Sequence, residues 1–247
     1  MKHISKGHEP QELLRYKKEN PGKKWEDFRQ ECPQGVDDLY QTLFQDQGGL
    51  CAYCEIKLSE QNRQIEHFHD KSDESDTTDP TRWHLDWANL FLTCKGGSQD
   101  TGKEQEFRQP ISVNLSCDKT KKGYHDIFRP DEIPAFPRLF RYEQHENAFT
   151  IHPDEQLCKE AGFPVEKVQK TIDEFHLNCP RLCEARLAIL KPLQHFLAKK
   201  QPLDVTSLIQ RFMRTNDSQT WNSFFTLFRW RFKEKAERYL TGISYNG

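Results

Sequence analysis

The spacing of hydrophobic residues predicts helices at the start of the chain. Apolar residues between positions 36 and 44 recur every three or four residues, which indicates an amphipathic helix ending at Gly48 and Gly49. Two shorter helices are expected before it, from Pro10 to Glu19 and from Trp25 to Gln30, because a proline suits the first turn of a helix and Asn20-Pro21-Gly22 stops one. These helices are expected to brace the segment that follows.

The middle of the chain predicts short and irregular elements. Ile65 to Phe68 reads as a short strand, and a strand points Glu66 and His67 to opposite faces unless its end twists or bulges. Residues 69–82 form a polar loop, interpreted either as the rim of a groove or as a plain connector. The polar segment 95–116 is expected to be ordered only in part.

The second half predicts strands or loops followed by helices. Prolines interrupt an apolar stretch between residues 128 and 151, and helical patterns then cover Pro164 to Leu177 and Pro180 to Lys199. Another helix is expected to begin at Asp204 as N-cap and to run to Arg214, and the last helix from Ser218 to Leu240. The last helix mixes aromatic with basic residues. We expect its aromatics to pack in the core and its basic face to bind nucleic acid or a partner.

Composition and charge narrow the class of protein. Of 247 residues, 35% are hydrophobic and 30% charged, which suggests a modest core under much polar surface, in one large domain or two small ones. No run approaches the roughly 18 apolar residues of a membrane span, so a cytoplasmic protein without a membrane partner is expected. Net charge is −2, yet residues 181–247 hold 12 Lys and Arg against 5 Asp and Glu. This basic segment fits a phosphate-facing surface or a dock for an acidic partner.

Four of the eight cysteines are candidates for a metal site. In a cytosolic chain thiols stay reduced, so a close pair such as Cys51 and Cys54 favours metal over disulfide. Cys94 and Cys117 can complete a four-thiolate Zn²⁺ site, which is closed and therefore structural. The other four cysteines are interpreted as ordinary thiols: Cys32, Cys158, Cys179 and Cys183. A second metal site at Cys179 and Cys183 is disfavoured, because Pro180 between them suits the first residue of a helix.

The order of these residues resembles that of a known family. Cys51-Ala52-Tyr53-Cys54 is followed by Ile65-Glu66-His67-Phe68, Trp87-Ala88-Asn89-Leu90, Cys94 and Cys117-Asp118-Lys119-Thr120-Lys121. This order resembles the HNH endonucleases, whose ββα-metal finger runs from a cysteine pair through an acid-His strand and an Asn to a second pair. The 95–116 insertion between Cys94 and Cys117 departs from that pattern, at a loop-closure cost of only about 0.6 kcal/mol per doubling of length.

Residues 1–29, 65–68 and Cys117-Asp118 are also similar to PtuB, the HNH subunit of Septu (PtuAB) antiphage systems, which also occur as retron effectors. The resemblance implies an α+β fold, mostly α, with a zinc-braced finger between N-terminal helices and a C-terminal helical region. The expected segments are an N-terminal brace over 1–49, the finger over 50–125, and a connecting and partner-docking region over 126–247. The implied partners are nucleic acid, the ATPase PtuA and, in a retron, a reverse transcriptase with its msDNA.

Phosphodiester cleavage needs a base for the attacking water and positive charge for the leaving oxygen. His67 suits the base because an ordinary imidazole pKa of about 6.5 leaves it largely neutral at pH 7. Asn89 is expected to hold that imidazole in place through a backbone or ring hydrogen bond, and Glu66 and Asp118 suit one Mg²⁺ or Mn²⁺ ion as oxygen ligands. By resemblance to the family, Lys121 would hold a phosphate.

Several alternatives remain at this stage. His69 or Asp70 could replace Glu66 as the metal ligand, and Lys119 or Lys122 could take the role of Lys121. The target could be DNA or RNA, including a tRNA, because a metal finger grips the phosphate backbone and carries little base recognition. A zinc-braced adaptor without catalysis, tying a partner to nucleic acid, would also account for the cysteines and the basic helices.

Overall fold

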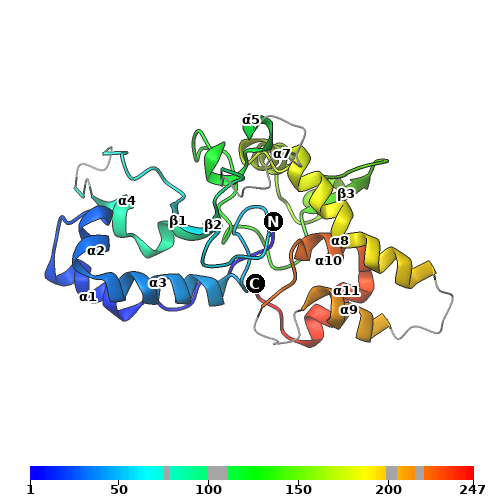
Figure 1. Cartoon of the computed structure of the whole chain (residues 1–247), viewed down its shortest axis with the longest axis horizontal. Helices are drawn as coiled ribbons and strands as arrows, with labels where there is room; N and C mark the ends of the chain where they lie inside the picture. Colours follow the sequence, from blue (N-terminus) through cyan, green and yellow to red (C-terminus); the bar gives the residue numbers. More distant parts are fainter. Residues whose placement is uncertain (75–77, 80, 99–110, 199–204, 215–219) are drawn as a thin grey trace.

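The computed structural model describes residues 1–74, 78–79, 81–98, 111–198, 205–214 and 220–247. It is a mostly helical α+β protein with two small antiparallel sheets, as the sequence predicts. Along the long axis, the N-terminal helices occupy one end and the last three helices the other, with the first sheet and both chain ends between them (Figure 1).

The N-terminal brace contains three helices, α1 (Gln11–Glu19), α2 (Trp25–Glu31) and α3 (Pro33–Asp46), which confirms the helices predicted there. Both α1 and α2 pack against α3 through fully buried apolar side chains. Gly48 then takes a left-handed backbone, and a Cβ there would lie 2.3 Å from the ring of Trp221. The chain can therefore turn tightly into the cysteine segment while touching the C-terminal region.

The central sheet pairs β1 (Arg63–His67) with β2 (Leu90–Cys94) in antiparallel register, so that Glu66 faces Phe91 across the ladder. Between them lie the short helix α4 (Arg82–Leu85) and the 3-10 turn η1 (Trp87–Asn89). After β2 come α5 (Ile111–Asn114) and the 3-10 turn η3 (Cys117–Lys119). The helix of a ββα finger would open at Asp118, but only this three-residue turn forms there.

The second sheet is a hairpin of β3 (Phe140–Gln144) and β4 (Phe149–Pro153), in the stretch where strands or loops were expected. The helices α6 (Glu155–Glu160), α7 (Val165–Glu174) and α8 (Pro180–Ala198) follow. α6 was not predicted from the sequence. Pro180 is the first residue of α8, as expected, whereas Lys199 lies outside the described residues.

The C-terminal region contains α9 (Val205–Met213), α10 (Phe225–Phe232) and α11 (Glu234–Gly242). The prediction of one helix from Ser218 to Leu240 is wrong, because left-handed backbone at Phe224 and positive φ at Lys233 divide the segment into two helices. Asp204, the expected N-cap, and Ser218 lie outside the described residues.

One cluster of buried apolar side chains runs from Met1 to Tyr245 and includes all four cysteines of the expected zinc site. Glu55, which follows the first cysteine pair, accepts a hydrogen bond from the backbone of Thr226 in α10 (2.8 Å). The three segments expected from the sequence therefore share a core. Among the described residues, no helix has the length and apolar character needed to cross a membrane.

Candidate functional site

Four cysteines converge in the core although 66 positions of the chain separate the first from the last. Cys51 and Cys54 lie in the turn before β1, Cys94 ends β2 and Cys117 begins η3. Their Sγ atoms all lie within 4.8 Å of one another, and neighbouring sulfurs are 3.6 Å (Cys54 to Cys94), 3.7 Å (Cys94 to Cys117) and 3.9 Å (Cys51 to Cys117) apart.

These sulfur distances fit a tetrahedral zinc site. Zn–S bonds of about 2.3 Å place the four sulfurs of a regular tetrahedron about 3.8 Å apart, close to the three values above. All four thiols are buried. Arg181 lies nearby, and its pKa is raised in spite of burial because the charges of the cysteines favour the guanidinium cation. The cluster is therefore compatible with structural zinc, as the sequence predicts.

The insertion between Cys94 and Cys117 does not prevent the site from closing. Gly96 and Gly97 both have left-handed backbones, and Ser116 N–H donates to the carbonyl oxygen of Gly96 (3.0 Å). This bond brings the chain back beside Cys94. Residues 99–110, the middle of the insertion, lie outside the described part of the chain, so the expectation of partial order is not tested there.

A cavity of about 530 Å³ opens beside this cluster, and we call it the finger cleft. Its lining comes from the end of β1, from the loop after it, and from the segment after Cys117. The lining residues include Glu66, His67, Asp70, Asp73, Asp118, Lys121, Lys122 and Tyr124. The cleft thus lies between the two segments in which the sequence predicts catalytic residues, the end of β1 and the segment after Cys117. Each segment contributes carboxylates to the lining.

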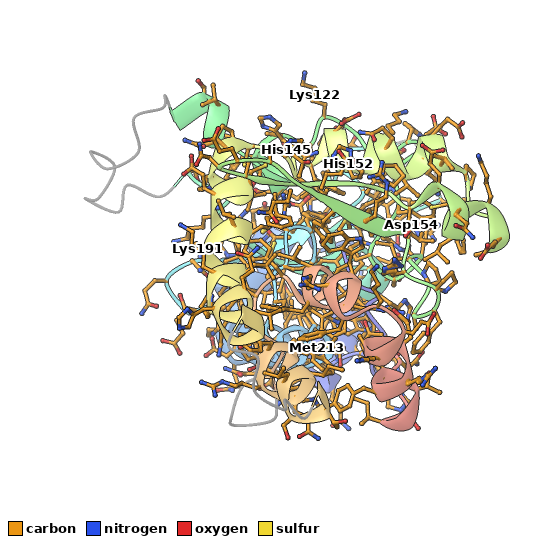
Figure 2. The ribbon with its side chains drawn as sticks, turned by 90° about the vertical axis from the view of Figure 1, so that its right-hand side faces the viewer. Lys122, His145, His152, Asp154, Lys191 and Met213 are labelled. Atoms are coloured by element: carbon orange, nitrogen blue, oxygen red, sulfur yellow. The ribbon has the colours of Figure 1, made fainter. Side chains whose placement is uncertain are left out.

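Lys121 closes one side of the finger cleft. Its Nζ forms an ion pair with Glu66 and also donates to the backbone oxygens of His67 (2.7 Å) and Phe68 (2.9 Å). Burial raises the pKa of Glu66, and Lys121 opposes that rise. An ammonium has three N–H donors, and here all three have partners within the chain. Lys121 therefore holds the end of β1. Lys122, by contrast, is exposed and projects away from the ribbon (Figure 2).

Asp118 lies on the same face of β1 as Glu66. Its Oδ2 is bonded by the amide of Gln64, two residues before Glu66, and by Lys119 (2.9 Å). Its Oδ1 is buried and has no hydrogen-bond partner among the described residues. Because an unpaired buried carboxylate oxygen is costly, this atom is suited to bind a cation.

The His67 ring is held on the other side of β1. Its Nε2–H donates to the backbone oxygen of His84 in α4 (3.0 Å), and its ring meets Trp25 of α2 edge to face at 5.3 Å. Burial lowers the pKa of His67 to about 4. The bond to a carbonyl fixes the proton on Nε2 and leaves the lone pair on Nδ1. His67 is therefore a neutral base candidate of fixed tautomer.

Asn89 supports the chain just after His67 through hydrogen bonds to the backbone. Its Oδ1 accepts from His69 N–H (2.6 Å), and its Nδ2 donates to the backbone oxygens of His69 (3.0 Å) and Trp83 (2.7 Å). Phe68 N–H donates to the backbone oxygen of Asn89 (2.9 Å). Asn89 is therefore a positioning residue for the end of β1.

The alternative ligands His69 and Asp70 are engaged elsewhere. The His69 ring stacks on Trp83 (ring centroids 3.7 Å apart) and contacts Tyr124 at a tilt (3.8 Å), and its Nε2 lies 3.4 Å from Asp73. Asp70 accepts hydrogen bonds from the backbone and side chain of Ser72. The structure thus brings Glu66, Asp118 and Lys121 to one cleft. The ligand atoms of Glu66, His67 and Asp118 do not form a group of three within 4.8 Å, and the expected ion held by Glu66 and Asp118 stays a prediction.

Sequence reasoning missed the contribution of Asp73, Tyr124 and His84. Tyr124 OH donates to Asp73 (3.1 Å) across the finger cleft, 51 positions away. His84 acts through its backbone oxygen, which every residue possesses, so its residue type could not predict this contact. Tyr124 and Asp73 lie outside the family motif, and only the folded chain brings them together.

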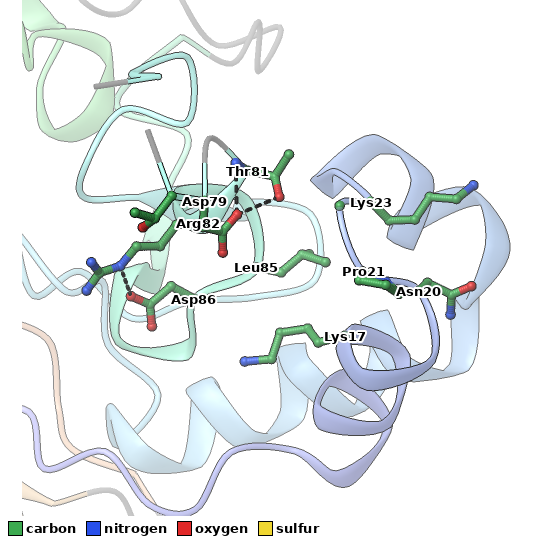
Figure 3. Close-up of a pocket in the computed structure, with 11 residues that line it drawn as sticks. Lys17, Asn20, Pro21, Lys23, Asp79, Thr81, Arg82, Leu85 and Asp86 are labelled. Atoms are coloured by element: carbon green, nitrogen blue, oxygen red, sulfur yellow. Dashed lines mark hydrogen bonds and ion pairs between the residues drawn. The ribbon is translucent and has the colours of Figure 1, made fainter. Parts of the chain in front are cut away.

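A second cavity, of about 780 Å³, lies between α4 and the turn after α1 (Figure 3). Its basic side chains are paired with acids: Lys17 with Glu9 (2.5 Å), Lys23 with Glu31 (2.6 Å) and Arg82 with Asp86 (3.9 Å). These ion pairs largely balance the positive charge of the basic residues that line this cavity.

No family model matches the chain. It is similar to an Escherichia coli protein named as the HNH endonuclease of retron Ec83, with 36% identity over 216 residues that cover 77% of this chain and 79% of the relative. The match extends well beyond the cysteine and histidine motifs.

Proposed function

Because the chain belongs to the HNH endonuclease family and is therefore a hydrolase acting on nucleic acid, we propose that the finger cleft is where it cleaves phosphodiester bonds. The observation that carries this proposal is that Glu66 and Asp118 face one cleft beside the four buried cysteines, and that His67 also lines this cleft. The cysteines would hold Zn²⁺ as a structural brace.

Asp118 and Glu66 would bind Mg²⁺ or Mn²⁺, and the unpaired buried Oδ1 of Asp118 supports this assignment. An ion bound there would supply positive charge to the phosphate oxygens. His67 would take the proton of the attacking water at Nδ1, since His84 fixes the other ring nitrogen. Asn89 keeps the end of β1 in place, and Lys121 keeps Glu66 in place. Lys122, exposed at the cleft, is the better candidate for a phosphate contact.

The central experiment is cleavage of DNA and RNA by the purified chain with and without Mg²⁺ or Mn²⁺, comparing His67→Ala with His195→Ala. His195 is an exposed histidine of α8, outside the cleft. Loss of a general base lowers rates by about 10²- to 10⁴-fold, and we expect this for His67→Ala alone. Equal activity in the two variants, both folded, would remove His67 from its role. Binding without cleavage under any metal would favour the adaptor.

We also propose a wider assembly. The relative is named for a retron, and the similarity to PtuB suggests an antiphage effector that works with an ATPase of the PtuA kind, in a retron also with a reverse transcriptase and msDNA. The C-terminal helices present exposed Arg231, Lys233 and Lys235 as a docking surface. Co-purification from the native operon tests the partners. Sequencing the ends of cleaved DNA and RNA identifies the substrate.

A further inference from the structure

The outer face of the β3–β4 hairpin gathers metal-binding side chains far in sequence from the finger motifs. Along both strands, buried apolar residues alternate with partly exposed polar ones. The buried set is Phe140, Tyr142, Phe149 and Ile151, and the outer set is Arg141, Glu143, Thr150 and His152. His145 follows β3 directly. Figure 2 shows His145 and His152 side by side on this ribbon.

Three of these side chains form one cluster. Each of Glu143, His145 and His152 offers a ligand atom, and the three atoms lie within 4.8 Å of one another. His152 Nε2 lies 3.7 Å from Glu143 Oε2. Besides the four cysteines, this is the one group of its kind within the part of the chain that the structure describes.

The backbone holds this cluster in place. The antiparallel register sets Glu143 opposite Thr150, and His145 N–H donates to the backbone oxygen of Ala148 (2.9 Å), which closes the turn. The apolar face of the hairpin packs on α7, α8 and α10. The donors therefore stand on two paired strands, which are more rigid supports than a free loop.

The Thr150 hydroxyl sits between the two imidazoles, 3.0 Å from Nε2 of His145 and 2.8 Å from Nε2 of His152. A hydroxyl has one hydrogen to donate, so at least one of these nitrogens donates to it in turn if both contacts are hydrogen bonds. Two neutral imidazoles can thus share this contact, and both turn their Nε2 atoms toward the same point.

We propose that Glu143, His145 and His152 form a second metal site, which binds a divalent transition metal of the Zn²⁺ or Ni²⁺ class at the surface of the hairpin. Two imidazoles and a carboxylate are a ligand set that such ions prefer over Mg²⁺. Three protein ligands leave a coordination position open, so the ion is exchangeable, unlike one enclosed by four buried thiolates. The site does not depend on the proposed nuclease mechanism.

The test is calorimetric titration of the purified, zinc-loaded chain with Ni²⁺. We expect one equivalent to bind in addition to the ion of the cysteine cluster and to the ion proposed for the finger cleft. Removing one imidazole by His145→Ala or His152→Ala should weaken this binding by more than about tenfold. His195→Ala, which removes an exposed histidine from α8, should bind as the wild type does.

A variant with the opposite expected effect makes the test sharper. Arg141 pairs with Glu143 and places a positive charge beside the proposed ion. Arg141→Gln should therefore tighten Ni²⁺ binding several-fold, because it frees the carboxylate and removes a like charge. Absence of the additional equivalent in the wild type, an equal loss in His195→Ala, or weaker binding in Arg141→Gln would each overturn the site. Circular dichroism of every variant separates loss of a ligand from loss of fold.

Discussion

Two adjacent lysines at the finger cleft, Lys121 and Lys122, differ in their exposure and in their partners. Lys121 forms a buried ion pair with Glu66, and each side chain is only 12% exposed, whereas Lys122 is exposed. A family motif can indicate Lys121 as a phosphate contact by its position in the sequence. It cannot show that the ammonium already donates to a carboxylate and to backbone oxygens of the chain. The contact with Glu66 joins residues 55 positions apart, which no local pattern reveals.

We expect Lys121→Met to destabilise the fold, because it leaves the buried Glu66 carboxylate unpaired. Breaking one side of a buried pair costs about 3 kcal/mol or more. The double variant Lys121→Met with Glu66→Gln should recover part of that loss, since no charge is then left alone. Urea unfolding measures both. If the single variant is as stable as the wild type, Lys121 does not position the strand end.

For Lys122→Ala we expect an unchanged unfolding midpoint and weaker nucleic-acid binding. Removing a single lysine–phosphate interaction reduces the slope of log K against log salt by about 1. Fluorescence anisotropy at several salt concentrations measures this slope. A slope equal to that of the wild type would show that Lys122 does not bind phosphate, and Lys119 would become the candidate.

Lys6 gives a prediction about pH. Its amine donates to the backbone oxygen of Leu90 (2.6 Å) and lies over the Trp87 ring, and burial lowers its pKa to about 7. In the unfolded chain a lysine pKa is about 10.4. Between these values the unfolded state holds more protons, so the free energy of unfolding should rise with pH. Lys6→Met should lose the part of this rise from pH 7 to 10 that Lys6 contributes, while Lys2, whose pKa burial lowers to about 8, keeps its own part. Parallel pH curves for the two proteins would contradict the prediction.

At the scale of elements, helices with a periodic pattern of apolar residues could be predicted from the sequence. Helix ends that lack a glycine or proline could not. The stripes of α3 and α7 mark their buried faces in the sequence. The division between α10 and α11 falls at Lys233, an ordinary residue with φ 52°, and Arg229, expected on a basic face, is instead buried against Glu237. That break is set by tertiary contacts that the pattern does not contain.

Gly96 lies shortly after β2 and packs against the backbone of Ser116, just before Cys117. Gly96→Ala should therefore make the cysteine cluster release zinc faster. A Cβ there would lie 2.3 Å from the backbone oxygen of Ser116, in a left-handed conformation (φ +60°). The matched control is Gly162→Ala, at φ +74° with nothing within 4 Å. The control should cost only the backbone strain of about 1 kcal/mol. Zinc release to a chromophoric chelator should be faster in Gly96→Ala alone; equal rates would show that the close approach is unimportant.

At the scale of the molecule, the motif residues predicted which four cysteines come together. Only the folded chain shows which contacts hold them in place. Tyr53, between the first two cysteines, stacks on Phe175 at 3.8 Å, and Cys117 N–H donates to the backbone oxygen of Phe175 (2.9 Å). A sequence pattern cannot show such contacts because they join the finger to a residue just after α7. They make the cysteine cluster a junction between the finger and the C-terminal half.

This junction predicts how the whole chain responds to loss of metal. Because one cluster of buried side chains spans the three segments, Cys117→Ser should lower the melting temperature of the entire chain in a single transition, including the C-terminal helices. Hydrogen exchange of the backbone amides of α10 and α11 reports on those helices, and far-ultraviolet circular dichroism reports on the whole chain. Cys158→Ser, at a buried cysteine outside the cluster, should cost only what an ordinary core substitution does. If the amides of α10 and α11 instead keep their protection while the rest of the chain unfolds earlier, residues 126–247 fold on their own. The finger would then be a separate unit that the zinc alone stabilises.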